Sequence, residues 1–223
     1  MFGLDMLAIA GAGLLSLSAS DLTCQKEAPP QITVRATTRE VRHNFRLTKD
    51  QLQRQKIDTI SPYDPHVETH VGGLMSGEIE ISSDVKLAWK SYPALRQDCL
   101  WFDAVNVTFE INPLIYVARD YPKGSCEHDV ILQHEYKHVA VDREIVKKYR
   151  GVMEQYLTQV LAQVPVYGPV KTTQTPRARQ KLSQYIEAAI KKVTDSMYAE
   201  RRNNQQAIDS LEEYERVAQA CKK

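Results

Sequence analysis

The stretch Ile131-Leu-Gln-His-Glu-Tyr-Lys-His-Val-Ala-Val-Asp142 decides how this chain is organised. His134 and His138 stand four positions apart, so on a helix both side chains project from the same face, about one turn apart. Apolar residues recur at helical spacing before and after this pair: Val130, Val141, Ile145 and Val152. The pattern therefore predicts a helix whose two histidines face the core.

This helix is expected to be long and to be followed by two more. Ser125, after Gly124, provides an N-cap, and the helical pattern continues to about Gln163. A turn-rich segment then interrupts it with Pro165, Gly168, Pro169 and Pro176. A second helix begins after Pro176, and its expected buried face contains Leu182, Ile186, Ala189, Val193 and Met197. A short last helix is expected from about Asp209-Ser210 to Cys221.

The sequence before the long helix has the alternating period of β-strands. The expected strands are Pro29–Thr38, Gly77–Ser82, Val85–Lys90, Val105–Ile111 and Leu114–Ala118. We predict an α+β fold, in which a sheet of roughly four to six mostly antiparallel strands precedes an active-site helix and an antiparallel partner helix. Residues 21–223 would form one domain, with the sheet at about 30–120 and the helical part at about 125–221.

The net charge of +1, from 29 Lys and Arg against 28 Asp and Glu, gives no reason to expect a nucleic-acid partner. The apolar run Met6–Leu17 is too short to span a bilayer and is typical of a secretory signal peptide cleaved near Ala19 or Ser20. The mature chain would then be secreted or periplasmic, without a membrane span. Cys24 offers a lipid-anchor alternative, but Asp21–Thr23 is a poor lipobox.

The four cysteines are Cys24, Cys99, Cys126 and Cys221. An even number in an exported chain predicts two disulfides, for which three pairings are possible. None of the four belongs to a C-x-x-C pair, so neither a thiolate zinc site nor a thioredoxin-like motif is expected.

The histidine pair and the adjacent Glu135 form the pattern H-E-x-x-H, in which two imidazoles hold zinc and the glutamate acts as general base. A catalytic zinc usually has a third protein ligand. Asp142 lies one turn further on the same helix and cannot easily reach the metal, so we predict that it orients a ligand.

The expected helical hairpin selects Glu200 as the third ligand. From His138 to the end of the helix the chain rises about 37 Å, and about 34 Å of return along the partner helix brings Glu200 level with His138. Glu200 also shares a face with Ile186, Val193 and Met197. Glu187 would stop roughly 20 Å short and can pair with Lys191, so it is the reserve candidate.

With these residues the chain resembles the zincin metallopeptidases, in particular their gluzincin-like branch. It is also similar to uncharacterised secreted bacterial proteins described as zinc-dependent proteases, in which a cysteine-led strand such as Cys99-Leu-Trp-Phe precedes the H-E-x-x-H helix. The specific part of the resemblance covers about residues 99–142, and Val139–Asp142 echoes thermolysin-like enzymes. Lys137 departs from the stricter zincin signature, which has uncharged residues there.

The resemblance implies a peptidase that acts on a peptide or protein substrate, with zinc on His134, His138 and Glu200 and with Glu135 as general base. An edge strand, Leu114–Ala118, would hold the extended substrate. The transition-state donor is left open between Tyr198, Arg201, His66 and His70. Two alternatives stay open as well: an inactive zincin-like domain of the cell envelope that binds metal or a partner, and a structural helix with buried histidines. The sequence predicts no oligomeric state.

Overall fold

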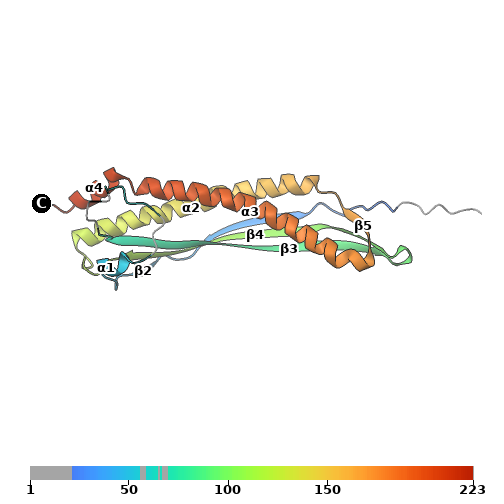
Figure 1. The fold of residues 1–223 in the computed structure, drawn as a ribbon, viewed down its shortest axis with the longest axis horizontal. Coiled ribbons are helices and arrows are strands. Elements are labelled where there is room, and N and C mark those ends of the chain that lie inside the picture. Colours follow the sequence, from blue (N-terminus) through green and yellow to red (C-terminus); the bar gives the residue numbers. More distant parts are fainter. Residues whose placement is uncertain (1–21, 56–58, 65, 67–69, 223) are drawn as a thin grey trace, which may run out of the picture.

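The computed structural model describes residues 22–55, 59–64, 66 and 70–222, which form an elongated molecule (Figure 1). The strands are β1 (Gln31–Thr38), β2 (Arg42–Asn44), β3 (Gly73–Tyr92), β4 (Gln97–Val117) and β5 (Tyr167–Lys171). The helices are α1 (Lys49–Leu52), α2 (Cys126–Gln163), α3 (Thr175–Ile208) and α4 (Leu211–Gln219). Two short 3₁₀ helices cover Pro93–Leu95 and Thr172–Gln174.

The strand β4 is the centre of a five-stranded sheet. It pairs with β3 along almost its whole length, and this pairing is antiparallel. Its other pairings are with β5 near residue 98, with β1 from residue 104 and with β2 from residue 114. Because β1 and β2 run parallel to β4, the sheet is mixed, and the predicted mostly antiparallel sheet is not confirmed.

The strands predicted separately within residues 73–117 join into one long hairpin. Gly77–Ser82 and Val85–Lys90 both belong to β3, whereas Val105–Ile111 and Leu114–Ala118 fall on β4, apart from Ala118 itself. Along β4 alternate residues are buried from Val105 to Val117. This alternation is typical of a sheet that has one face in the core. The segment 114–116 is paired on both sides, with β2 and with β3, so the expected substrate-binding edge does not lie there.

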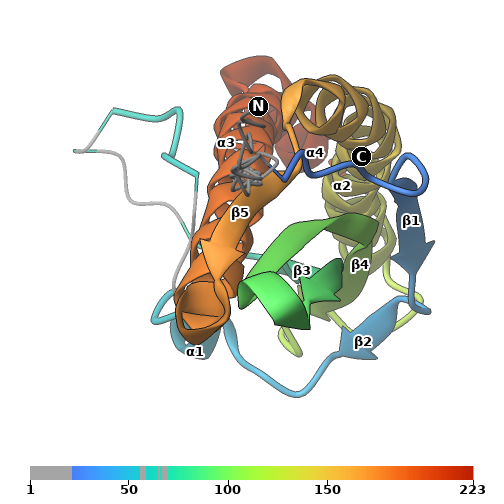
Figure 2. The same cartoon turned by 90° about the vertical axis from the view of Figure 1, so that its right-hand side faces the viewer.

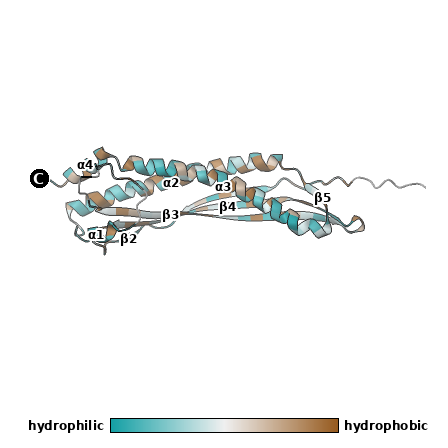
Figure 3. Cartoon of the chain, viewed as in Figure 1, coloured by the Kyte–Doolittle hydropathy of each residue, from teal (hydrophilic) through white to brown (hydrophobic). Residues whose placement is uncertain are grey.

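The long helix α2 covers the buried face of the sheet, and α3 packs beside α2 (Figures 1 and 2). Two side chains of α3 reach the edge strand: the Tyr198 hydroxyl donates to the Ile79 carbonyl at 2.8 Å, and the Arg201 guanidinium donates to the Gly77 carbonyl at 3.3 Å. Figure 3 shows hydrophilic and hydrophobic residues alternating along both helices, as expected for amphipathic helices packed on a core.

The apolar interior is divided into two clusters along the molecule. The larger one lies between α2, α3 and the sheet and includes Phe109, Met153 and Ile186. The smaller one lies beneath the first turns of α2 and includes Ile115 and Ile131. The predicted histidine pair therefore lies on the part of α2 that covers the smaller cluster.

The predicted helices are confirmed. The side chain of Ser125 caps α2 by accepting from the His128 backbone, and α2 ends at Gln163 as expected. The connection after it contains β5, which the sequence did not predict, and β5 pairs with the first residues of β4. The Thr175 hydroxyl then bonds to Asp98, so α3 starts at this end of the sheet, beyond the last turn of α2 (Figure 1).

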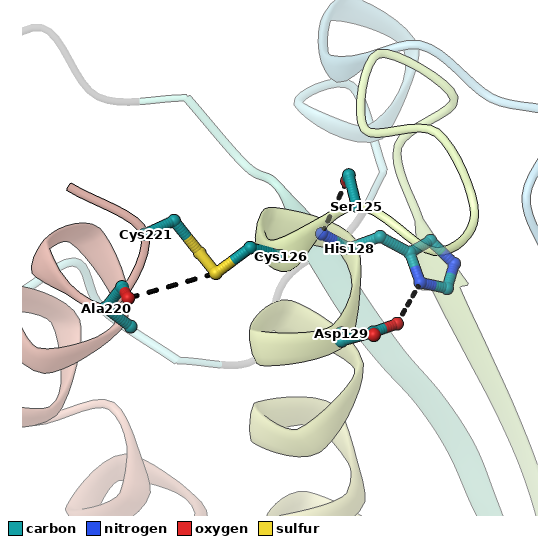
Figure 4. The surroundings of a disulfide bond; sticks show 6 residues. All are labelled: Ser125, Cys126, His128, Asp129, Ala220 and Cys221. Carbon is teal, nitrogen blue, oxygen red and sulfur yellow. Dashed lines mark hydrogen bonds and ion pairs between the residues drawn. A yellow bond between two sulfur atoms is a disulfide. The ribbon is translucent and has the colours of Figure 1, made fainter. Parts of the chain in front are cut away.

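All four cysteines are paired, as Cys24–Cys99 and Cys126–Cys221. The second bond joins the first turn of α2 to the residues that follow α4 (Figure 4). Two disulfides are compatible with an extracellular or periplasmic location. The predicted signal peptide lies outside the described residues. Within residues 22–55, 59–64, 66 and 70–222, no helix has the length and apolar character needed to cross a membrane.

Candidate metal centre

Three buried side-chain atoms that could act as metal ligands meet where α2, α3 and α4 come together. The Nε2 atoms of His134 and His138 lie 3.3 Å apart, and each lies 3.1 Å from Oδ1 of Asp209. The two histidines are 8 % exposed and Asp209 is 4 % exposed. This buried group could hold a metal ion.

Gln205 fixes the orientation of the His138 ring. Its side-chain amide nitrogen donates to the His138 carbonyl at 3.1 Å and to Oδ1 of Asp142 at 2.7 Å, and both of these atoms can only accept. The amide oxygen of Gln205 must therefore be the atom that faces Nδ1 of His138, at 2.5 Å. Since this oxygen accepts, Nδ1 carries a proton, and in the neutral ring Nε2 is the nitrogen that can bind a metal.

Glu213 fixes the orientation of the His134 ring. Its carboxylate faces Nδ1 of that ring at 3.2 Å and also accepts from Lys137 at 2.6 Å and Arg216 at 2.7 Å. The hydrogen bond from Arg216, with further help from Lys137 and His134, lowers the pKa of Glu213 below its ordinary value. An ionised Glu213 accepts from Nδ1–H, so in the neutral ring Nε2 of His134 is the nitrogen left to bind a metal.

Two imidazole nitrogens and a carboxylate oxygen in mutual contact form a set of ligand atoms that a cation could bridge. In a tetrahedral zinc site with bonds of about 2.0–2.1 Å, neighbouring ligand atoms lie about 3.3 Å apart. The observed separations of 3.1, 3.1 and 3.3 Å match that spacing. The residues present therefore fit a small divalent cation, although the donors do not identify the metal.

Asp209 reaches the histidines because α3 ends at this residue. Ser210 follows in an extended conformation and caps α4, its hydroxyl accepting from the backbone of Glu213 at 3.3 Å. The break between the two helices directs the Asp209 side chain toward α2. Burial alone would raise the pKa of Asp209, but hydrogen bonds with His134 and His138 hold it well below its ordinary value.

The structure places Glu200 apart from this group. Its carboxylate accepts from Lys148 at 2.7 Å and from the Tyr149 hydroxyl at 3.0 Å. The residue level with His138 is Gln205, five positions later than the predicted one. The cause is the start of α3 beyond the end of α2, because the return then needs more residues than two helices with level ends would need.

The other predicted carboxylates are also located by their contacts. The reserve candidate Glu187 is exposed on α3, and Lys191 pairs with Asp195 at 2.6 Å, not with Glu187. Asp142, predicted to orient a ligand, is fully buried and contacts His138 through Gln205. Its carboxylate also accepts two hydrogen bonds from Arg201, at 2.6 and 3.0 Å.

Glu135 lies on the other side of the pocket, between α2 and β3. It is 4 % exposed, and this burial raises its pKa to about 7. The backbone of Met75 contributes a hydrogen bond to the carboxylate. A side chain at Gly73 would place Cβ 2.6 Å from its Oε1, so a glycine is needed for the strand to approach this closely.

The remaining histidines lie outside the pocket. His66 and His70 are exposed and belong to none of the described strands. His43, on β2, bonds to the Tyr136 hydroxyl at 2.9 Å. His128 is buried in the first turn of α2, where its ring packs against Phe45.

Sequence reasoning missed Asp209, Gln205 and Glu213. The signal for Asp209 was present, because Asp209-Ser210 was expected to separate two helices, and a carboxylate at a helix end can point back along the bundle. Glu213 stands three positions after the Ser210 cap, where a glutamate commonly completes a capping box. No sequence pattern distinguishes Gln205 from its neighbour Gln206.

Comparison of the chain with models of known protein families, with curated proteins and with solved structures finds no match. The functional argument therefore rests on the geometry of the pocket.

Proposed function

We propose that this protein is a zinc-dependent peptidase of the zincin type, exported to an oxidising compartment. The proposal rests mainly on one observation. Three buried atoms that could bind a metal, on His134, His138 and Asp209, lie together with the Glu135 carboxyl beside them. A structural metal site is usually closed by four protein ligands, whereas three ligands and a buried acid are typical of a hydrolytic site. The third ligand would be an aspartate, not the glutamate of the gluzincin-like layout.

A zinc ion bound here would polarise a peptide carbonyl and lower the pKa of a water molecule. Glu135 would accept a proton from that water. Its pKa of about 7 lies near neutral pH, where a carboxylate both takes a proton and returns it to a leaving amine. The same residue would thus serve as base and then as acid.

A hydrogen-bond donor for the developing oxyanion is also required. The four candidates from the sequence are less suitable: Tyr198 donates to Ile79, Arg201 binds Asp142, and His66 and His70 are exposed. We assign this role to Tyr214, which lines the pocket and whose hydroxyl hydrogen-bonds to the proposed ligand Asp209, so that it lies beside the metal-ligand group. Burial raises the pKa of its hydroxyl, so the group stays protonated and remains a donor at neutral pH.

The substrate class follows from the strand that borders the pocket. Residues Gly73–Met75 of the edge strand β3 line it together with the histidines. Strand backbone next to a hydrolytic centre is suited to an extended polypeptide. The edge beside the pocket is β3, in place of the segment 114–118 expected from the sequence.

The test is the exchange Glu135→Gln in the zinc-loaded protein, assayed on a mixed peptide library by mass spectrometry. We expect hydrolysis to fall by at least about a hundredfold while zinc content is unchanged, because the base is lost and the ligands are not. Glu144→Gln, an exposed position on the same helix, is the matched control and should cleave normally. A wild-type protein that binds zinc and cleaves nothing would instead be the inactive metal-binding domain.

A further inference from the structure

The segment Thr59–Tyr63 runs beside the metal-ligand group. Thr59 lines the pocket that contains both histidines, and its hydroxyl forms a hydrogen bond with Asp209. The first residue of the segment therefore contacts one of the three donors that would bind the metal.

The next residue is fastened to α3 by its main chain. The Ile60 backbone N–H donates to the Gln206 side-chain oxygen at 2.8 Å, and the Gln206 side-chain nitrogen donates to the Ile60 carbonyl at 3.0 Å. The Ile60 side chain itself is 78 % exposed. The side-chain amide of Gln206 thus binds both the N–H and the carbonyl of Ile60. The Ile60 side chain contributes nothing to this attachment.

A third contact lies at the far end of the segment. The Tyr63 ring meets the Tyr214 ring edge-on, with centroids 5.9 Å apart, and Tyr214 in turn meets His134 at 5.9 Å. The segment is thus attached to Asp209, to Gln206 and to Tyr214. Its first residue, Thr59, forms part of the pocket wall beside Asp209 and Tyr214.

The segment is attached by few and exposed interactions. Each of its residues is exposed or only partly buried, and none belongs to the apolar clusters. Segments that bury little apolar surface and rely on solvent-exposed hydrogen bonds open at low cost in free energy. A segment that lies against the metal-ligand group but is weakly attached can move away from it.

We propose that Thr59–Tyr63 is a strap that closes the metal-ligand group and must lift before a polypeptide can reach it. The strap restricts access to His134 and His138 in the resting protein, and the Gln206 carboxamide is its main fastening. The proposal rests on the proposed function only for the nature of what enters the pocket. The shielding itself is a property of the chain with or without metal.

The experiment measures that shielding without zinc and without substrate. The metal-free protein is treated with diethylpyrocarbonate, and mass spectrometry follows the modification rate of His134 and His138 relative to the exposed His43. In Gln206→Ala we expect this relative rate to rise about tenfold, since two hydrogen bonds of the strap are lost. Ile60→Ala keeps both main-chain bonds and should stay within about twofold of wild type.

Thr59→Val removes the hydrogen bond to Asp209 at nearly constant volume and should also raise the relative rate. Wild-type rates in both Gln206→Ala and Thr59→Val would overturn the proposal, as would an equal increase at His43, which would mean general loosening. Failure of the peptidase proposal would leave this result unaffected, because neither zinc nor turnover enters the measurement.

Discussion

At the scale of single residues, the histidine pair depends on partners that hold its rings. Gln205 joins Asp142 to Nδ1 of His138, and Glu213 joins Lys137 to Nδ1 of His134. Lys137, the departure from the zincin signature, thus takes part in orienting a ligand. Partners of this kind usually change metal affinity by 10–100-fold when they are removed.

Gln205→Leu removes the acceptor for His138 and the donor for Asp142. We expect zinc affinity to fall by about 10–100-fold, because the ring loses its fixed orientation. Competition with a fluorescent zinc chelator measures this change. Gln184→Leu, the same exchange at an exposed position of α3, should leave the affinity unchanged, and equal effects of the two variants would contradict the account.

The buried Glu135 makes the stability of the metal-free protein depend on pH. Burial raises its pKa from 4.5 to about 7, so between these values the folded chain holds a proton that the unfolded chain has released. Stability from this group is present below pH 4.5 and is lost as pH rises through 7. At 1.36 kcal/mol per unit of pKa, the loss is about 3 kcal/mol at most.

Urea unfolding of wild type and Glu135→Gln between pH 4.5 and 7.5 isolates this contribution, since the amide does not titrate. We expect the free energy of unfolding to decline more steeply with pH in wild type than in the variant. Parallel profiles would show that Glu135 is ionised in the folded protein throughout this range.

At the scale of secondary-structure elements, the two disulfides have different neighbours. Cys126–Cys221 ties the residues after α4 to the first turn of α2, whereas Cys24–Cys99 ties the N-terminal segment to β4. They close loops of similar size, with separations of 95 and 75 residues. Each is expected to contribute at most about 4–5 kcal/mol through chain entropy.

The two cysteine pairs therefore provide a matched comparison. Replacing Cys126 and Cys221 by serine should lower both stability and zinc affinity, because α4 is then free to move away from α2. Replacing Cys24 and Cys99 should lower stability by a similar amount and leave zinc affinity close to wild type. Thermal unfolding and zinc competition measure the two effects, and an equal loss of zinc affinity in both pairs would contradict this role for α4.

The elements also show how far the sequence could predict this protein. The bounds of α2 and its Ser125 cap followed from hydrophobic period and capping chemistry, both of which are local. The parallel pairing of β1 and β2 with β4 was not predictable, because it depends on contacts between residues far apart in the chain. The third carboxylate was misplaced for the same reason: β5 carries the chain past α2 and shifts the register of α3.

At the scale of the whole molecule, the metal group lies at one end of an elongated fold (Figure 1). The strand β5 lies at the opposite end, where it pairs with the first residues of β4. A metal that binds only the folded chain stabilises it by about 4 kcal/mol at a free concentration a thousandfold above its dissociation constant. This stabilisation should be felt most strongly near the donors.

Removing zinc with a chelator should therefore accelerate hydrogen exchange in α4 and in the first turns of α2, because these elements are held together by the ligands. Exchange at β5 and the adjoining end of β4 should change little. Mass spectrometry of peptides from both ends measures the difference. A uniform acceleration over the described chain would mean that the metal acts on global stability alone.

The central claim is that His134, His138 and Asp209 bind zinc, and the most direct measurement is the zinc content of purified wild type, Asp209→Ala and Glu200→Ala. The account predicts about one zinc per chain in wild type and in Glu200→Ala, and a large loss in Asp209→Ala. Zinc lost from Glu200→Ala but kept in Asp209→Ala would contradict the observed register of α3. A wild-type protein that takes up no zinc would contradict the metal centre itself.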